Sequence, residues 1–192
     1  FTTRTQEAHK SLSLISKIHK RRREMYYEPK NYFIDYVNSS KKMLKNTSEL
    51  LTKLNERFPN INLLVKPHPN ENLQFWHYLE DKLDNLKIIK DLTLENFLKL
   101  SDLNISQNIC SSTFEAQLMS IRTIEMQTNF VKKYSSKIHQ KLADYVVFDS
   151  NKILTILSKI ISNNKKNLLN KKKKKYINNF FHKFDGERCR NY

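Results

Sequence analysis

Apolar residues recur along residues 32–58 at spacings of three, four and seven, which is the pattern of a helix with one buried face. Pro59 ends this pattern, and the short apolar run at 61–65 then predicts a buried strand. From there to residue 162, short apolar runs alternate with helical patterns. We expect strands at 61–65, 86–89, 103–106, 121–126 and 145–148, and helices at 71–83, 93–100, 112–119 and 151–162.

This alternation predicts an α/β fold, in which βαβ units build a parallel sheet with helices on both faces. Ligands bind to such sheets beyond the carboxyl ends of the strands. The places to look for a site are therefore Lys66–Asn70, Ser106–Thr113 and the segment after Met126. We expect this α/β domain to span residues 32–162, between a helical basic lead-in at 1–31 and a helical basic tail at 163–192.

The distribution of charge and the glycine content limit the kinds of binding site that the chain can form. The 192 residues carry a net charge of +16, but residues 1–30 hold 8 basic and 3 acidic residues, and residues 163–192 hold 10 and 2. In the domain between them, basic and acidic residues are nearly equal in number. The excess follows either from a Lys- and Asn-rich composition or from selection for a basic surface. The one glycine, Gly186, excludes the glycine-rich phosphate loops.

Several protein classes are not indicated. No run of 18 apolar residues predicts a membrane span, and no signal peptide is visible. Two cysteines form no disulfide framework, so a cytoplasmic location is the default expectation. The histidines do not have the spacing of a zinc site, and we expect no metal. A chain that begins at Phe1 reads as processed, trimmed or a fragment.

The Lys-Pro-His-Pro-Asn segment at 66–70 must be a loop, because two prolines exclude a helix and a central strand. Each proline favours an extended residue before it, so the loop is stiff and holds His68 at the end of a strand. His68 can donate or accept a hydrogen bond when neutral, and can pair with a phosphate when protonated. Lys66 would add a fixed positive charge. The alternative interpretation is a rigid turn without a ligand.

Three hydroxyl residues, Ser111, Ser112 and Thr113, come at the start of a predicted helix. Backbone N–H groups and the helix dipole attract anions at such a start, and hydroxyls complete a phosphate site. Ser112 and Glu115 also fit a capping box, which leaves Ser111 and Thr113 for a ligand. Glu115 could instead face a ribose hydroxyl. A Cys110–His68 nucleophile pair is conceivable, but no third group is evident to orient it.

Two basic blocks, Lys20–Arg23 and Lys171–Lys175, have three open interpretations. They can form a solvated face. They can approach an anionic membrane surface. They can also bind the phosphate backbone of a nucleic acid.

These motifs together resemble a known family. Lys-Pro-His-Pro-Asn-Glu at 66–71 is followed by Ser-Asp-Leu-Asn-Ile-Ser at 101–106 and Cys-Ser-Ser-Thr-Phe-Glu-Ala at 110–116. The pattern is similar to the C-terminal, donor-binding half of GT-B-type glycosyltransferases of bacterial surface polysaccharide synthesis. More closely, it is similar to surface carbohydrate biosynthesis proteins and their capsule polysaccharide and polyglycerophosphate transferase relatives. The resemblance covers roughly residues 33–190. That family usually has Gly-Lys-Pro where this chain has Ser-Ile-Arg at 120–122.

The resemblance implies a Rossmann-like domain that binds a nucleotide-activated sugar as substrate, without a metal or cofactor. It implies that His68, the residue expected in a catalytic role, contacts the nucleotide phosphate beside Lys66. It also implies that Ser111, Ser112 and Thr113 help to bind phosphate, and that Glu115 lies near the ribose or sugar. The acceptor, a saccharide or a lipid-linked saccharide, would bind to an N-terminal acceptor domain that these residues do not contain.

Three hypotheses follow. The first is the donor-binding half of a cytoplasmic glycosyltransferase, peripheral to the inner membrane, which has no activity without its other half. The second is a non-enzymatic basic module that binds RNA or an anionic membrane. The third is an inactive relative that keeps only the fold.

Overall fold

The computed structural model describes residues 1–3, 8, 14, 17–18, 20–21, 29, 31–108, 110–134 and 142–163. Most of the basic lead-in, and the tail after residue 163, lie outside the described residues. The expectations for Lys171–Lys175 and for both basic ends therefore stay predictions.

Each strand and helix expected between residues 32 and 162 is present, with ends that differ by no more than three residues. One further helix, α6, was not expected from the sequence. The elements are α2 (Tyr32–Arg57), β1 (Leu63–Val65), α3 (Leu73–Glu80), β2 (Leu86–Ile88), α4 (Leu94–Lys99), β3 (Leu103–Gln107), α5 (Ser111–Leu118), β4 (Arg122–Met126), α6 (Asn129–Tyr134), β5 (Tyr145–Val147) and α7 (Asn151–Asn163).

The strands form two small parallel sheets rather than one. In the first, β1 pairs with β2, and Leu63 lies opposite Leu86. In the second, β4 lies between β3 and β5. The parallel α/β architecture is therefore confirmed, but the single sheet expected from the sequence is divided.

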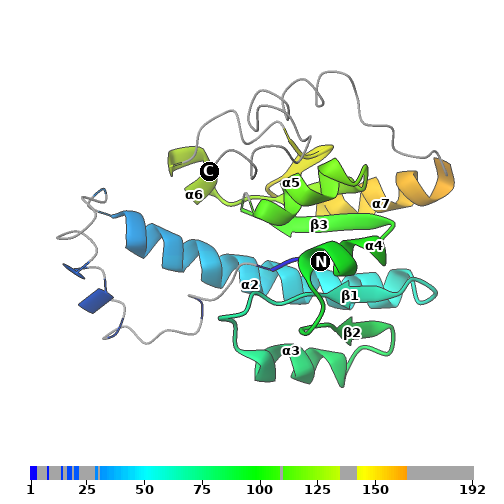
Figure 1. The fold of residues 1–192 in the computed structure, drawn as a ribbon, viewed down its shortest axis with the longest axis horizontal. Coiled ribbons are helices and arrows are strands. Elements are labelled where there is room, and N and C mark those ends of the chain that lie inside the picture. The colour runs from blue at the N-terminus through cyan, green and yellow to red at the C-terminus, as the bar shows by residue number, and fades with distance from the viewer. Residues whose placement is uncertain are drawn as a thin grey trace, which may run out of the picture.

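The segment Phe1–Thr3 lies between the two sheets (Figure 1). On the β1 side, the Lys66 amide donates to the Phe1 carbonyl at 2.8 Å, and the Thr3 amide donates to the Lys66 carbonyl at 3.3 Å. On the β3 side, the Thr2 amide donates to the Ile105 carbonyl at 3.0 Å. Hydrogen bonds thus connect β2, β1, Phe1–Thr3, β3, β4 and β5 in that spatial order.

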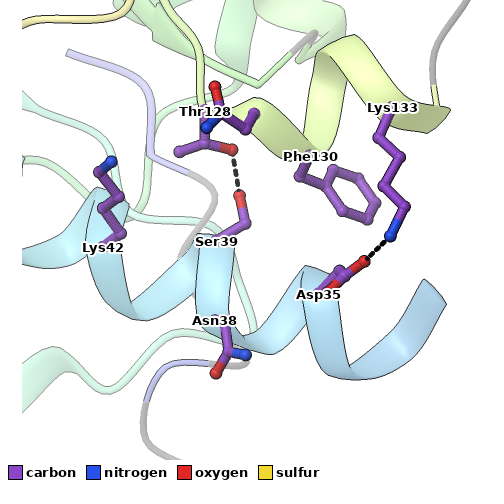
Figure 2. Close-up of a pocket in the computed structure, with 8 residues that line it drawn as sticks. Asp35, Asn38, Ser39, Lys42, Thr128, Phe130 and Lys133 are labelled. Atoms are coloured by element: carbon purple, nitrogen blue, oxygen red, sulfur yellow. Dashed lines mark hydrogen bonds and ion pairs between the residues drawn. The ribbon is translucent and has the colours of Figure 1, made fainter. Parts of the chain in front are cut away.

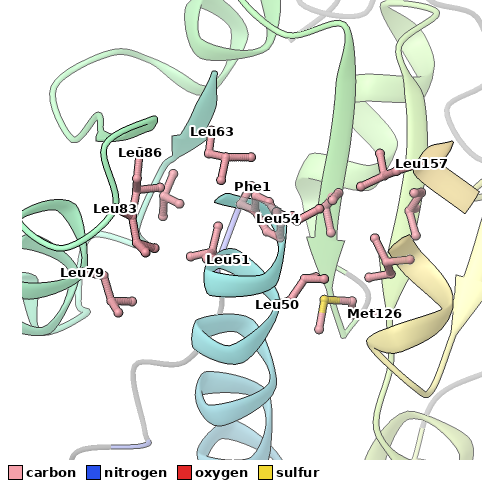
Figure 3. Close-up of a cluster of buried hydrophobic side chains, with 14 of the residues drawn as sticks. Phe1, Leu50, Leu51, Leu54, Leu63, Leu79, Leu83, Leu86, Met126 and Leu157 are labelled. Atoms are coloured by element: carbon pink, nitrogen blue, oxygen red, sulfur yellow. The ribbon is translucent and has the colours of Figure 1, made fainter. Parts of the chain in front are cut away.

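Helices cover both faces of these strands, as the alternation predicted. Leu63 and Val65 of β1 belong to the larger apolar cluster, which includes side chains of α2, α3 and α7 (Figure 3). Leu64 points to the opposite face, because successive side chains of a strand alternate, and it packs against the cluster formed by α4 and α5. Phe1 lies in the larger cluster between the two sheets.

Candidate functional site

The Pro-His-Pro loop leaves the carboxyl end of β1 as a tight turn. The Glu71 amide donates to the His68 carbonyl at 2.8 Å. The Asn70 amide donates to Nδ1 of His68 at 3.3 Å. Since Nδ1 accepts this bond, the proton of the neutral ring is on Nε2. His68 is half-buried and can present Nε2–H as a donor to a ligand.

Lys66 interacts with the loop after β2. Its Nζ donates to the Lys90 carbonyl at 3.0 Å and also to the Leu92 carbonyl. Burial lowers the pKa of Lys66, and the nearby carboxylate of Asp91 opposes that shift. The ammonium expected beside His68 is thus engaged in holding two loops together.

Glu71 is a buried carboxylate that sequence reasoning did not single out. Its Oε2 accepts hydrogen bonds from the Thr3 hydroxyl at 2.6 Å and from Nε1 of Trp76 at 2.8 Å. The side chain therefore ties the Pro-His-Pro loop and α3 to the Phe1–Thr3 segment.

The start of α5 differs from the expected capping box. Helix α5 begins at Ser111, and its N-cap residue, Cys110, makes no side-chain capping bond. Ser112 lies inside the helix and is buried, and its Oγ is 2.5 Å from Oγ1 of Thr2. The prediction that Ser112 caps the helix is therefore wrong.

Thr113 is also engaged inside the protein, although we expected its hydroxyl to be available to a ligand. Its Oγ1 lies 2.5 Å from Oγ of Ser106 and donates to Oε2 of Glu125 at 3.2 Å. Ser111 is the exposed hydroxyl at this helix start. It is the member of the predicted trio placed to meet a ligand from solvent.

Glu115 lies one turn further along α5 and is half-buried. Burial raises the pKa of this carboxyl, and the like charge of Glu95 on α4 raises it further. His68 and Cys110 follow strands that are two positions apart, with Phe1–Thr3 between them. No hydrogen bond joins their side chains in the part of the chain that the structure describes.

A pocket of about 300 Å³ opens at the carboxyl end of β4 (Figure 2). Helix α2 forms one wall, and α6 together with Thr128 before it forms the other. The lining residues are Asp35, Asn38, Ser39, Lys42, Thr128, Asn129, Phe130 and Lys133. None of the six site residues predicted from the sequence lines it, although it lies in the predicted segment after Met126.

Asn108, Ser39 and Thr128 form a polar network beside this pocket. Asn108 follows β3 with a φ of 45°, a left-handed conformation that asparagine tolerates. Its Nδ2 donates to Oγ of Ser39 at 3.0 Å, and its Oδ1 accepts from the amide of Thr128 at 3.0 Å. The hydroxyls of Ser39 and Thr128 are 2.5 Å apart. The network fixes α2 against the ends of β3 and β4.

The pocket carries more positive than negative charge. Asp35 accepts hydrogen bonds from Nζ of Lys133 at 2.7 Å and from the Tyr134 hydroxyl at 2.6 Å. These two bonds lower the pKa of Asp35, the Lys133 bond contributing most. Lys42 adds a second ammonium at the exposed rim. Two cations against one carboxylate favour an anionic ligand.

The α2 residues of this pocket were missed because nothing in the pattern of a long amphipathic helix marks Ser39 or Lys42 as special. Thr128 and Asn108 fall in the strand-end segments that the fold rule selected. The signal that would have found the pocket is the strand order, which the sequence alone does not give.

Comparisons with family models, curated proteins and solved structures found no match to this chain. Among the described residues, no helix has the length and apolar character needed to cross a membrane. The same residues contain no group of three or more His, Cys, Asp or Glu side chains placed to hold a metal ion.

Proposed function

We propose that this chain is the donor-binding domain of a GT-B-type glycosyltransferase, which transfers a sugar from a nucleotide-activated donor during bacterial surface polysaccharide biosynthesis. The observation that carries the proposal is the spatial order β2, β1, Phe1–Thr3, β3, β4, β5. Numbered along the chain with Phe1–Thr3 first, this is the order 3-2-1-4-5-6 of Rossmann-like nucleotide-binding sheets.

In that order, the strands are added toward one edge of the sheet as far as β2 and toward the other edge from β3 onward. The topological switch point therefore lies between Phe1–Thr3 and β3, and nucleotides bind at such a point. The Pro-His-Pro loop lies on one side of this point and the α5 start on the other, since Glu71 bonds to Thr3 and Ser112 bonds to Thr2. His68 and the N-terminus of α5 are therefore the groups we assign to the donor's phosphates.

A second feature supports the family resemblance. Ser120 follows α5 with a φ of 59°, a conformation that favours glycine. The resembling family usually has glycine at this turn. The chain keeps the backbone shape of that turn with a serine.

In the proposed reaction, this domain positions the donor and stabilises the leaving phosphate with hydrogen bonds and positive charge. His68 donates through Nε2, and Lys42 supplies charge at the neighbouring pocket. The acceptor binds to a separate N-terminal domain, so the chain studied alone binds the donor without transferring the sugar. No metal or cofactor enters the proposal.

Titration calorimetry with CMP, CDP and UDP tests this function. We expect one of the nucleotides to bind, and His68→Ala to weaken its binding about tenfold or more, as for the loss of a hydrogen bond to a charged group. His77→Ala is the matched control, because His77 is an exposed histidine on α3 that bonds to Glu80. Equal affinities of the His68→Ala variant and the unmodified chain would remove His68 from the site, and failure of all three nucleotides to bind would contradict the function.

The RNA- or membrane-binding alternative depends on the basic ends, most of which lie outside the described residues. It predicts binding that weakens steeply with salt and is lost on deletion of residues 163–176.

A further inference from the structure

A polar stripe runs along the first half of α2. Asp35, Asn38, Ser39 and Lys42 are spaced by three and four residues, so they lie along one side of the helix. All four line the pocket of about 300 Å³ at the carboxyl end of β4. The buried apolar residues in this half of α2 occupy other positions. The stripe therefore adds nothing to the apolar packing of α2, and it supplies one wall of the pocket.

Two contacts join the walls of this pocket, and both are drawn as dashed lines in Figure 2. Asp35 on α2 accepts a hydrogen bond from Nζ of Lys133 on α6 at 2.7 Å. One turn further along α2, the hydroxyls of Ser39 and Thr128 are 2.5 Å apart. Because the walls are joined directly, the pocket is preformed, and binding does not have to order them.

Three polar side chains of the pocket remain available to a ligand. Lys42 and Asn38 on α2 and Asn129 on α6 are exposed. Within the described part of the chain, none of these side chains makes a hydrogen bond or an ion pair. The ammonium of Lys42 only donates, whereas an asparagine amide both donates and accepts. Together they fit a ligand with one anionic group and several hydroxyls.

Phe130 gives the pocket an apolar surface. Its ring packs against the rings of Tyr32, Tyr36 and Tyr134, with centroid distances of 5.2, 5.4 and 5.0 Å. These contacts hold the ring in place, and it stays half-buried at the pocket wall. Ligand sites typically combine such an apolar surface with a few placed polar groups. The C–H side of a sugar ring matches this surface.

The dimensions of the pocket disfavour a bare inorganic anion. Lys42 follows Asp35 by seven residues, which is about 10 Å along the helix axis at about 1.5 Å per residue. Since Asp35 holds Lys133, the two ammonium groups lie at opposite ends of the pocket, too far apart for one phosphate to contact both (Figure 2). The volume of about 300 Å³ is at the small end of ligand sites, about 300–1,000 Å³. It admits a ligand of the size of a sugar ring.

We propose that this pocket binds a hydroxylated carboxylate of the size of a sugar ring. Its carboxylate pairs with Lys42, its hydroxyls bond to Asn38 and Asn129, and its ring lies against Phe130. Such a group has two sources, a free sugar acid and the sugar of a nucleotide-activated donor. Only the second source rests on the proposed function, because the pocket shares no residue with His68 or the start of α5.

Chemical-shift titration of the isotope-labelled chain tests this proposal, with D-glucuronate, D-galacturonate, D-glucose and inorganic phosphate as probes. We expect at least one of the sugar acids to shift the side-chain amide signals of Asn38 and Asn129 until they saturate. It should bind about tenfold or more tightly than glucose or phosphate. Lys42→Gln should weaken its binding about tenfold or more, because the carboxylate loses a charged partner. Lys42→Arg keeps the charge and should retain most of the affinity.

Lys41→Gln is the matched control, because Lys41 is an exposed lysine beside Lys42 that does not line the pocket. It should leave the affinity unchanged. Equal losses in Lys41→Gln and Lys42→Gln would assign the binding to general surface charge and overturn the proposal. Failure of both sugar acids to bind, or equally tight binding of glucose or phosphate, would also overturn it. Both lysines are exposed, so the substitutions should leave the signals of distant residues unchanged.

Titrations with UDP and UDP-glucuronate separate the two sources. Tighter binding of UDP-glucuronate than of UDP or glucuronate alone, with the Asn38 and Asn129 signals still shifted, identifies the ligand as the donor's sugar. If a sugar acid binds but CMP, CDP and UDP all fail to bind, the ligand is a free sugar acid, and the proposed function fails while the pocket assignment stands. Nucleotide binding without sugar-acid binding has the opposite consequence for the two proposals.

Discussion

The two halves of the strand system, on either side of Phe1–Thr3, both contribute side chains to the larger apolar cluster, but the β3–β4 half also buries a layer of polar side chains on its other face. In the β1–β2 half, Leu63, Val65 and Leu86 pack against apolar residues of α3. In the β3–β4 half, the side chains that face α5 are polar, and all of them are at most 1 % exposed. They are Asn104, Ser106, Thr123 and Glu125.

This difference means that apolar burial mainly stabilises the fold, whereas the polar layer mainly fixes the position of α5. Apolar burial is non-directional and contributes in proportion to area, so the β1–β2 half can tolerate small shifts of α3. A buried polar layer contributes little net energy, but its hydrogen bonds hold only in one geometry. The α5 start, which we assign to the donor's phosphates, is thereby fixed by bonds from Thr2, Ser106 and Glu125.

The largest effect is expected in the apolar half. Trp76 of α3 is 0 % exposed and contacts the β1–β2 half. Trp76→Ala should lower the free energy of unfolding by about 3–5 kcal/mol, because it leaves a large cavity. Urea denaturation followed by circular dichroism measures this loss.

Trp76→Phe is the matched control, because it retains most of the packing but removes the donor to Glu71. We expect it to cost clearly less than Trp76→Ala. If both variants lost the same stability, the Glu71 bond rather than apolar packing would hold this half together, and the contrast between the halves would disappear.

A smaller effect is expected in the polar half. Thr113→Val keeps the shape of the side chain but removes the hydroxyl that bonds to Ser106 and Glu125. The free energy of unfolding should fall by about 1–3 kcal/mol, the cost of leaving buried polar groups without a partner. Thermal or urea unfolding gives this value.

The double variant Ser106→Ala/Thr113→Val sharpens the comparison. Replacing both partners by apolar groups removes the orphaned Ser106 hydroxyl, so the double variant should lose less stability than the sum of the two single variants. Strictly additive losses would show that the hydroxyls do not interact and that α5 is held by packing alone.

The sequence predicted the elements well because their apolar runs are local. The alternation of strands and helices from residue 61 to 162 needs only neighbouring residues to be recognised. Helix α6 was missed because six residues, Asn129–Tyr134, are too few for a helical period to stand out.

The site was less predictable because its contacts join distant parts of the chain. Phe1 bonds to Leu64 across 63 positions, and Thr2 bonds to Ser112 across 110. Three residues carry no periodic pattern, so nothing in Phe1–Thr3 indicated a central strand. The polar residues of β3 and β4 alternate with apolar ones, which is also the pattern of a sheet face exposed to solvent.

The smallest expected effect distinguishes the start of α4 from that of α5. Thr93 caps α4, and its Oγ1 accepts from the Asn96 amide at 3.2 Å, whereas α5 has no side-chain cap. Thr93→Ala should therefore cost about 1 kcal/mol in the free energy of unfolding, and Ser111→Ala should cost only a few tenths. If Ser111→Ala nevertheless weakens nucleotide binding, then the exposed hydroxyl at α5 serves the ligand and not the helix. Equal losses in the free energy of unfolding for the two variants would mean that Ser111 stabilises its helix as Thr93 does. That result would contradict the assignment of the α5 start to ligand binding.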